Sequence, residues 1–284
     1  MKIGISMYSY NRSVNKGAIT LSEAIKDAKA AGYEQVEFVD LTAPEGVSLQ
    51  DYAGQLRRMC GSEGLKISGY MVSADFINNR GGDAAKEAGR LKGCLDIAAI
   101  MGAKVLRHDV TWDYHGKRGD YKEAAETVAP YIRTVAEYGA SLGVKTMTEN
   151  HGYFFQDSYR MEYLVDKVNH PNYGLLIDMG NFLCADEDPI SAVARLAPYA
   201  FHLHAKDFLY KNGAAPSPDE TWFPTRGGNL LRGTVIGHGV VPVRQCVAIM
   251  KNAKYAGDIA VEFEGLEDPK DAARLGYAYL RNIL

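Results

Sequence analysis

Four residues that could bind a metal ion each end a short apolar run in the second half of the chain. They are Glu149, Asp178, His204 and Glu262, at the ends of the runs 145–149, 175–178, 201–204 and 259–262. A loop and then a helical pattern follow each run. In a parallel barrel the carboxyl ends of all strands meet at one mouth, so these side chains would converge there. Three carboxylates and one imidazole are suitable ligands for a divalent ion, and the sequence therefore predicts a metal-dependent enzyme.

The alternation of side chains along each strand favours this convergence. Successive side chains of a strand point to opposite faces, so Val261 and Phe263 would pack outward while Glu262 points to the barrel axis. The same alternation turns His204 and Lys206 inward. Carboxylates crowded into a barrel mouth raise one another's pKa, and a divalent ion removes this penalty. Mn²⁺ is the ion we expect, with Mg²⁺, Co²⁺ and Zn²⁺ as alternatives.

The elements that would position these residues alternate between strand and helix about eight times. The expected strands are 2–7, 35–39, 65–71, 104–107, 145–149, 173–178, 200–204 and 258–262. Helical patterns lie between them, and glycines such as Gly32 and Gly102 end several of these helices. This alternation predicts parallel strands with right-handed crossovers, and therefore a single (β/α)8 TIM barrel domain over residues 1–284. An open doubly wound sheet is the competing fold, but residues 7–11 lack its glycine-rich phosphate loop.

Two connections are longer than a strand–helix loop usually needs. One covers residues 72–82, and the other covers residues 205–241, which are rich in proline and glycine. Both follow strands, so both would lie at the carboxyl-end face where barrel active sites are found. Each is either a plain surface loop or a lid that excludes water from the site.

Composition excludes several classes of protein. A formal net charge of −3 without a basic cluster does not favour a nucleic-acid partner. No apolar run approaches the roughly 18 residues of a membrane helix, and the chain begins directly as a strand without the layout of a signal peptide. No two cysteines form a Cys-x-x-Cys pair, and we interpret all of them as free thiols. Free thiols fit a reducing compartment, so we expect a cytoplasmic protein. They are Cys60, Cys94, Cys184 and Cys246.

Five motifs identify a resemblance that covers nearly the whole chain. They are Thr148–Gly152 (TENHG), Ile177–Asn181 (IDMGN), His202–Asp207 (HLHAKD), Gly237–Val241 (GHGVV) and Val261–Gly265 (VEFEG). With these motifs the chain resembles the xylose-isomerase-like TIM-barrel superfamily of sugar phosphate isomerases and epimerases. It looks closest to branches related to ketose 3-epimerases, inosose dehydratases and inosose isomerases.

The resemblance implies a site and a reaction. Glu149, Asp178, His204 and Glu262 would bind the metal, and Glu149 and Glu262 would also act as the acid–base pair. The metal would hold the carbonyl and a neighbouring hydroxyl of a keto sugar or inosose and stabilise an enediolate. Return of the proton gives isomerisation or epimerisation. The alternative is a lyase, in which a β-hydroxyl leaves and the sugar is dehydrated.

Five further residues are candidates for binding the carbohydrate substrate. They are His151, Lys206, Arg107, Glu37 and His238. His151 is either a substrate contact or a structural histidine, and Lys206 either holds a substrate oxygen or pairs with Asp207 or another acid. Glu37 either bonds a sugar hydroxyl or orients His204.

Departures from ketose 3-epimerases leave the substrate open. Asn181 stands where those enzymes commonly carry histidine. Lys206 and Asp207 stand just beyond His204, where those enzymes carry arginine. His238 stands between two glycines, where relatives often have an acid.

Two other functions are alternatives. An endonuclease-IV-like repair enzyme would need more histidine ligands and a basic rim, and a non-catalytic sugar-binding barrel would not need all four ligands. A homo-oligomer is compatible with the sequence, which specifies no interface.

Overall fold

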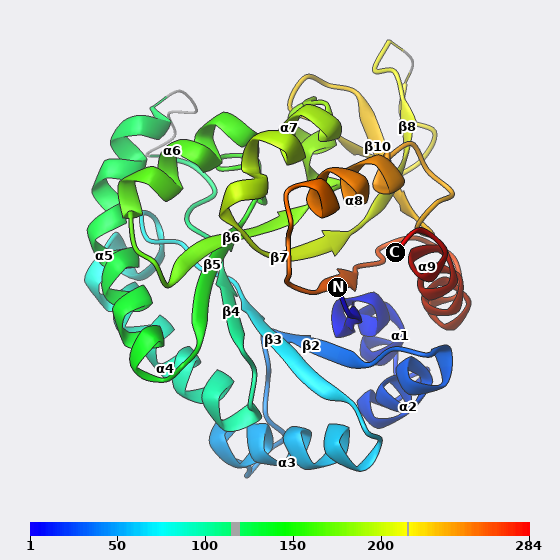
Figure 1. The fold of residues 1–284 in the computed structure, drawn as a ribbon, viewed down its shortest axis with the longest axis horizontal. Coiled ribbons are helices and arrows are strands. Elements are labelled where there is room, and N and C mark those ends of the chain that lie inside the picture. The colour runs from blue at the N-terminus through cyan, green and yellow to red at the C-terminus, as the bar shows by residue number, and fades with distance from the viewer. Residues whose placement is uncertain (115–119, 215) are drawn as a thin grey trace. The chain divides into compact units, whose positions relative to one another are not determined.

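A computed structural model describes residues 1–114, 120–214 and 216–284, and its strands close into a barrel (Figure 1). The strand order is β1-β11-β7-β6-β5-β4-β3-β2, and the paired neighbours run parallel. The predicted (β/α)8 TIM barrel is therefore confirmed. The barrel strands are β1 (Ile3–Ser6), β2 (Gln35–Val39), β3 (Lys66–Val72), β4 (Val105–His108), β5 (Lys145–Glu149), β6 (Tyr173–Asp178), β7 (Ala200–Ala205) and β11 (Ile259–Val261).

Capping residues mark the ends of several helices. Thr20 and Glu23 form a capping box before α2, and Gly32 ends that helix in the left-handed conformation at φ +108°. Asp268 caps α9 and is followed by Pro269, whose missing N–H costs nothing in the first turn. The helices are α1 (Asn11–Asn15), α2 (Leu21–Ala31), α3 (Leu49–Ser62), α4 (Ala84–Met101), α5 (Tyr121–Ser141), α6 (Ser158–Val168), α7 (Pro189–Leu196), α8 (Val243–Asn252) and α9 (Pro269–Ile283).

The chain divides into two compact units, of which the first is residues 37–176. It holds β3, β4, β5 and most of β6, with Val105 of β4 in register with both Gly69 of β3 and Lys145 of β5. Helices α3 to α6 lie along one side of these strands (Figure 1). Leu91 of α4 and Leu106 of β4 are fully buried, as expected for parallel strands covered by helices.

The second unit comprises residues 1–36 and 177–284. Its three barrel strands are in register at their centres, with Ala260 of β11 opposite Gly4 of β1 and His204 of β7. This register sets His204 opposite Ala260, two residues before Glu262. Burial of Ala260 and Val261 is complete, so the end of β11 is fixed by packing on both faces.

The long connection after β7, for which the sequence left a plain surface loop and a lid as alternatives, contains regular structure. It forms an antiparallel sheet of β8 (Asp207–Lys211), β10 (Leu230–Thr234) and β9 (Phe223–Pro224), in the order β8-β10-β9. Position 215 of this connection lies outside the described residues. Proline and glycine obscured these short strands, and the pairing of β8 with β10 joins residues as far apart in the sequence as Asp207 and Thr234. The other long connection contains the 3-10 helix η2 (Asn79–Gly81).

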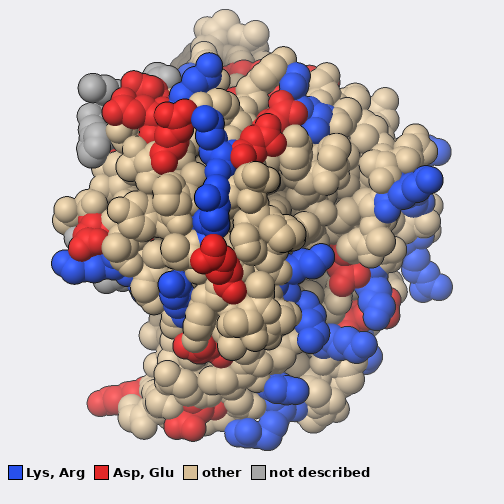
Figure 2. All heavy atoms as spheres, turned by 60° about the vertical axis from the view of Figure 1, so that its left-hand side comes forward, with Lys and Arg blue, Asp and Glu red and all other residues tan. Residues whose placement is uncertain are grey.

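Surface charge is mixed where it can be seen. Figure 2 shows Lys and Arg side chains interspersed with Asp and Glu side chains on one face of the protein. Within the described part of the chain, no helix has the length and apolar character needed to cross a bilayer.

Two helical glycines allow a matched test of packing in the first unit. A Cβ at Gly139 of α5 would lie 2.7 Å from the carbonyl oxygen of Val144, whereas a Cβ at Gly93 of α4 would meet no atom within 4 Å. We expect Gly139→Ala to lower the free energy of unfolding by about 1–3 kcal/mol through overpacking. Gly93→Ala should raise it by about 0.5–1 kcal/mol, because alanine loses less backbone entropy. Urea denaturation measures both, and equal effects would contradict the packing.

Candidate active site

Three of the four predicted metal ligands lie together in the second unit. Asp178 ends β6, His204 lies in β7, and Glu262 follows β11 directly. Their candidate ligand atoms lie within 4.8 Å of one another. Nδ1 of His204 is 3.5 Å from Oε2 of Glu262 and 3.8 Å from Oδ2 of Asp178. All three residues are buried. These three positions therefore form one compact group of possible ligands, which we call the acidic cluster.

Lys206 places a positive charge in the acidic cluster. Its Nζ lies 2.7 Å from Oε2 of Glu262, 3.2 Å from Oε2 of Glu264 and 3.4 Å from Oδ2 of Asp178. It also donates to Oδ1 of Asn181 at 3.3 Å. Three carboxylates therefore surround one ammonium in this group. Buried carboxylates need pairing with positive charge, so this surplus of carboxylates favours a further cation.

The charges around Glu262 keep its carboxylate ionised. Desolvation by burial raises the pKa of Glu262, but the Lys206 ammonium and the His204 imidazole together outweigh burial. The pKa of this carboxyl therefore lies well below the ordinary value of glutamate. An ionised carboxylate is the form that binds a metal or accepts a proton.

Lys206 pairs with acids other than its neighbour Asp207, which agrees with the alternative that it forms an ion pair with Asp207 or another acid. The Asp207 carboxylate instead accepts backbone N–H groups of Phe208, Gly237, Gly239 and Val241 at 2.8–3.0 Å. Consecutive residues of an extended chain point to opposite sides, so the two side chains diverge. Burial raises the pKa of Asp207 despite these hydrogen bonds. Its main effect is to fix the loop 237–241.

His238 lies in the loop that Asp207 fixes, and its side chain is exposed. Its backbone N–H donates to the carbonyl of Val235. Among the described residues, no hydrogen bond or ion pair joins its imidazole to the acidic cluster. The contact between His238 and the substrate therefore stays a prediction.

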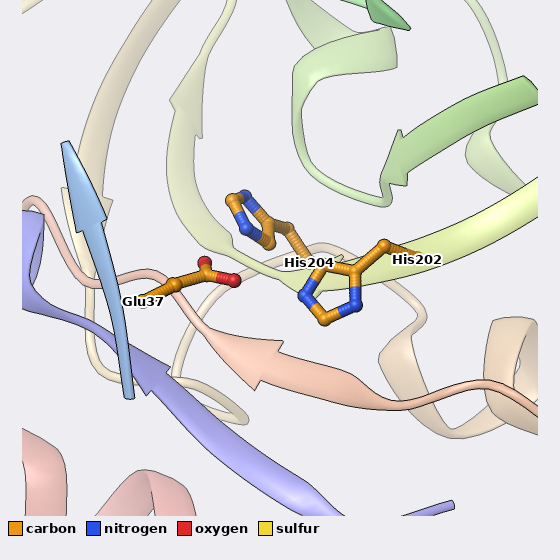
Figure 3. Close-up of side chains that lie close together, drawn as sticks. All are labelled: Glu37, His202 and His204. Carbon is orange, nitrogen blue, oxygen red and sulfur yellow. The ribbon is translucent and has the colours of Figure 1, made fainter. Parts of the chain in front are cut away.

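Two histidines of β7 point to the same side of the strand (Figure 3). The ring centroids of His202 and His204 are 5.7 Å apart, and the rings meet edge to face at 78°. Both residues are buried. Glu37, which Figure 3 also labels, lies in the middle of β2 and is fully buried.

The first unit carries the remaining predicted residues in a second charged group. Arg107 of β4 donates to Oε2 of Glu149, from Nε at 2.6 Å and from Nη2 at 2.5 Å. The same Nη2 lies 3.2 Å from Oδ1 of Asp109, which in turn lies 3.0 Å from Nδ1 of His151. Glu149, Arg107 and Asp109 are buried, whereas the side chain of His151 is 36% exposed. The exposed imidazole edge is the part that a ligand can reach.

Asp109 controls the protonation of its neighbour His151. Burial alone would lower the pKa of His151, but the hydrogen bond and charge of Asp109 raise it above the ordinary value. Burial raises the pKa of Asp109, and Arg107 and His151 outweigh it, so this carboxyl stays ionised. Trp112 packs edge-on against the imidazole at 5.2 Å between centroids. His151 is thus oriented by a carboxylate on one side and an indole on another.

Strand pairing places Glu149 on the strand next to the one that carries Asp178. Glu149 of β5 is in register with Leu176 of β6, and Asp178 lies two residues further along β6.

Glu264 is a charged residue beside the acidic cluster to which the sequence analysis assigned no role. The alternation of side chains that turns Glu262 inward turns Glu264 inward as well, so its position near Lys206 could have been predicted from the strand pattern.

His108 of β4 is a buried histidine beside this charged group. Its Nδ1 lies 2.8 Å from the carbonyl oxygen of Asp109, and among the described residues none hydrogen-bonds its Nε2. Phe76 packs edge-on against the ring and Tyr173 stacks on it. Burial lowers the pKa of His108 to about 4. The folded protein therefore holds this imidazole in its neutral form at neutral pH.

Comparison with known proteins identifies relatives of the whole barrel. The sequence profile described as Xylose isomerase-like TIM barrel matches residues 25–283. An inosose dehydratase from Lacticaseibacillus casei is 24% identical over 273 residues, covering 92% of this chain and 87% of that protein. A xylose isomerase-like TIM barrel protein from Mycobacterium smegmatis, solved in complex with magnesium, matches with a TM-score of 0.75 at 16% identity, covering 99% of this chain and 96% of that one. An L-ribulose 3-epimerase matches with a TM-score of 0.73 at 14% identity, covering 100% and 94%.

The buried His108 predicts a pH dependence of stability. An unfolded histidine binds a proton below about pH 6.5, whereas folded His108 does so only below about pH 4. The stability that neutral His108 contributes to the folded state is therefore fully present above about pH 6.5. As the pH falls from about 6.5 to 4, the free energy of unfolding decreases by about 3 kcal/mol through this residue. His108→Gln should reduce the slope of unfolding free energy against pH in this window. A direct NMR titration that places the His108 pKa near 6.5 would contradict the prediction.

Proposed function

Because the chain belongs to the xylose isomerase-like TIM barrel family, we propose that it is a metal-dependent enzyme acting on a keto sugar or inosose. The proposed reaction removes a proton from the carbon next to the carbonyl and returns it, giving isomerisation or epimerisation through an enediolate. The acidic cluster of Asp178, His204 and Glu262 is the observation that carries this proposal.

The donor set fits a divalent ion. Asp178, His204 and Glu262 offer two carboxylates and one imidazole within 4.8 Å of one another, and the surrounding charge is negative. We assign Glu149 as the fourth ligand, because its register with Leu176 sets it on the strand next to β6. Mostly oxygen ligands suit Mn²⁺, Mg²⁺ or Co²⁺, and Zn²⁺ is compatible with the imidazole. The magnesium of the Mycobacterium smegmatis relative supports a hard divalent ion.

When bound, such an ion would polarise the carbonyl and stabilise the negative charge that develops on the sugar oxygens. Glu149 and Glu262 are the proposed acid–base pair, and each is oriented by a cation. Arg107 fixes Oε2 of Glu149, and Lys206 fixes Oε2 of Glu262. Both glutamates are buried, so little water competes for the proton that they exchange.

The substrate contacts are assigned by exposure and charge. His151 presents a partly exposed imidazole edge that can bond a sugar hydroxyl. Lys206 donates to several carboxylates and can also stabilise an oxyanion. Glu37, fully buried on β2, is better suited to orienting an imidazole of β7 than to binding a sugar. The expected partner is a small carbohydrate.

Dehydration of an inosose is the second candidate function. The inosose dehydratase relative supports it, and so does the contact between Nδ1 of His151 and Oδ1 of Asp109. An imidazole held through Nδ1 presents Nε2 to the substrate, where it can protonate a leaving hydroxyl. Isomerisation needs only the two glutamates, whereas dehydration also needs this acid.

Proton exchange tests the proposed reaction directly. In D₂O, protein loaded with Mn²⁺ or Mg²⁺ should exchange the proton next to the carbonyl of an accepted ketose or inosose, as followed by proton NMR. A new epimer or isomer supports the first candidate, and a vinylic proton supports dehydration. Glu149→Gln should slow exchange by about 10²–10⁴-fold while the protein stays folded. The exposed Glu45 provides the control Glu45→Gln. Unchanged exchange in Glu149→Gln would remove Glu149 as base or ligand.

Metal binding has its own test. His204→Ala should weaken metal binding by at least about 100-fold, because a ligand contributes more than the outer partners whose loss costs 10–100-fold. Metal content after dialysis, measured by mass spectrometry, gives the result without reference to turnover. The exposed His238 supplies the control His238→Ala, which should retain the metal. Equal metal content in all three proteins would place the site elsewhere.

A further inference from the structure

A cavity of about 590 Å³ lies between α1 and the segment that follows β11. Its lining comes from residues 8–16 and residues 263–269, all in the second unit. This volume falls in the range of roughly 300–1,000 Å³ that is typical of small-molecule sites. None of the proposed metal ligands lines it, so the cavity is additional to the acidic cluster.

One side chain joins the cavity to the acidic cluster. Glu264 lines the cavity, and its Oε2 lies 3.2 Å from Nζ of Lys206. The same Nζ lies 2.7 Å from Oε2 of Glu262. Ser9, another lining residue, accepts the backbone N–H of Phe263 at 3.0 Å and so ties the two walls together. A ligand held at the acidic cluster would therefore have the cavity next to it.

The acceptors of the cavity are fixed by other contacts. Glu264 is bound by Lys206, and Glu267 accepts the hydroxyl of Thr234 at 2.6 Å. Asp268 accepts two backbone N–H groups as the cap of α9. Carboxylates held in this way are preorganised acceptors, so a ligand does not have to order them.

The cavity offers donors and acceptors together with an aromatic face. Arg12 and Lys16 supply donors, and the ring of Tyr8 is 40% exposed. An anion would be repelled by three carboxylates, and a cation by the two basic side chains. Hydroxyl groups both donate and accept, and an apolar ring face packs on an aromatic ring, so the lining suits a neutral polyol. The amide side chains that complete it are Asn11 and Asn15.

We propose that this cavity binds a second, neutral polyhydroxylated ring that is covalently attached to the keto sugar or inosose. The substrate is then the size of a disaccharide or a glycosylated inositol rather than a single ring. The proposal rests on the proposed function only for the position of the first ring at the acidic cluster.

Paired ligands that differ by one ring test the proposal. D-Fructose is compared with lactulose and isomaltulose, and myo-inositol with galactinol, by saturation-transfer NMR titration of metal-loaded protein. We expect at least one two-ring ligand to bind about tenfold more tightly than its single ring. Tyr8→Ala and Asn11→Ala should remove most of this advantage and leave single-ring binding unchanged. Asn252→Ala, at an exposed asparagine of α8 outside the cavity, is the matched control.

Three results would overturn the subsite. They are equal affinity for one-ring and two-ring ligands, a two-ring advantage that neither cavity variant reduces, and tighter binding of D-glucose 6-phosphate than of the neutral ligands. Binding is measured without turnover, which separates this proposal from the proposed reaction. A two-ring advantage in a protein that exchanges no proton would retain the subsite and remove the reaction.

Discussion

The buried ammonium of Lys206 is the contact on which the arrangement of the acidic cluster depends. Carboxylates removed from water are tolerated only when paired, and Lys206 lies within 3.4 Å of oxygens from Asp178, Glu262 and Glu264. It neutralises part of their charge and fixes their oxygens relative to one another. The ammonium of Lys206 favours the ionised form of Glu262, and the carboxylate charge that it leaves unbalanced suits a divalent ion. One lysine thus links the proposed chemistry to the proposed subsite.

Arg107 has the corresponding role in the first unit. Its guanidinium contacts Glu149 and Asp109, and Asp109 then orients His151. A planar, permanently charged group suits this position, because it can direct two carboxylates at fixed angles. The pattern in both units is the same: a buried cation holds the carboxylates, and a histidine lies beside them. The proposed acid–base pair therefore receives its orientation from side chains that do not themselves exchange protons.

The supporting elements are organised around the ends of the strands. In a parallel barrel the carboxyl ends of the strands are where active-site side chains gather, and Glu149, Asp178 and Glu262 all lie there. After β7 the chain adds the sheet β8-β10-β9, and Asp207 at its start binds the backbone of residues 237–241. The loop 237–241 is thereby held by hydrogen bonds to one carboxylate as well as by the buried side chain of Val241.

The sequence by itself determined the barrel and the strand ends that carry Asp178, His204 and Glu262. Periodicity suffices for this, because the direction of a side chain on a strand is a local property. Only the tertiary structure decided that Lys206 contacts Glu264 rather than Asp207, that residues 207–234 form a sheet, and that a cavity lies beside the acidic cluster. These features depend on which distant segments pack together. The local spacing of residues predicts neither the pairing of strands that are far apart in the sequence nor the presence of a cavity.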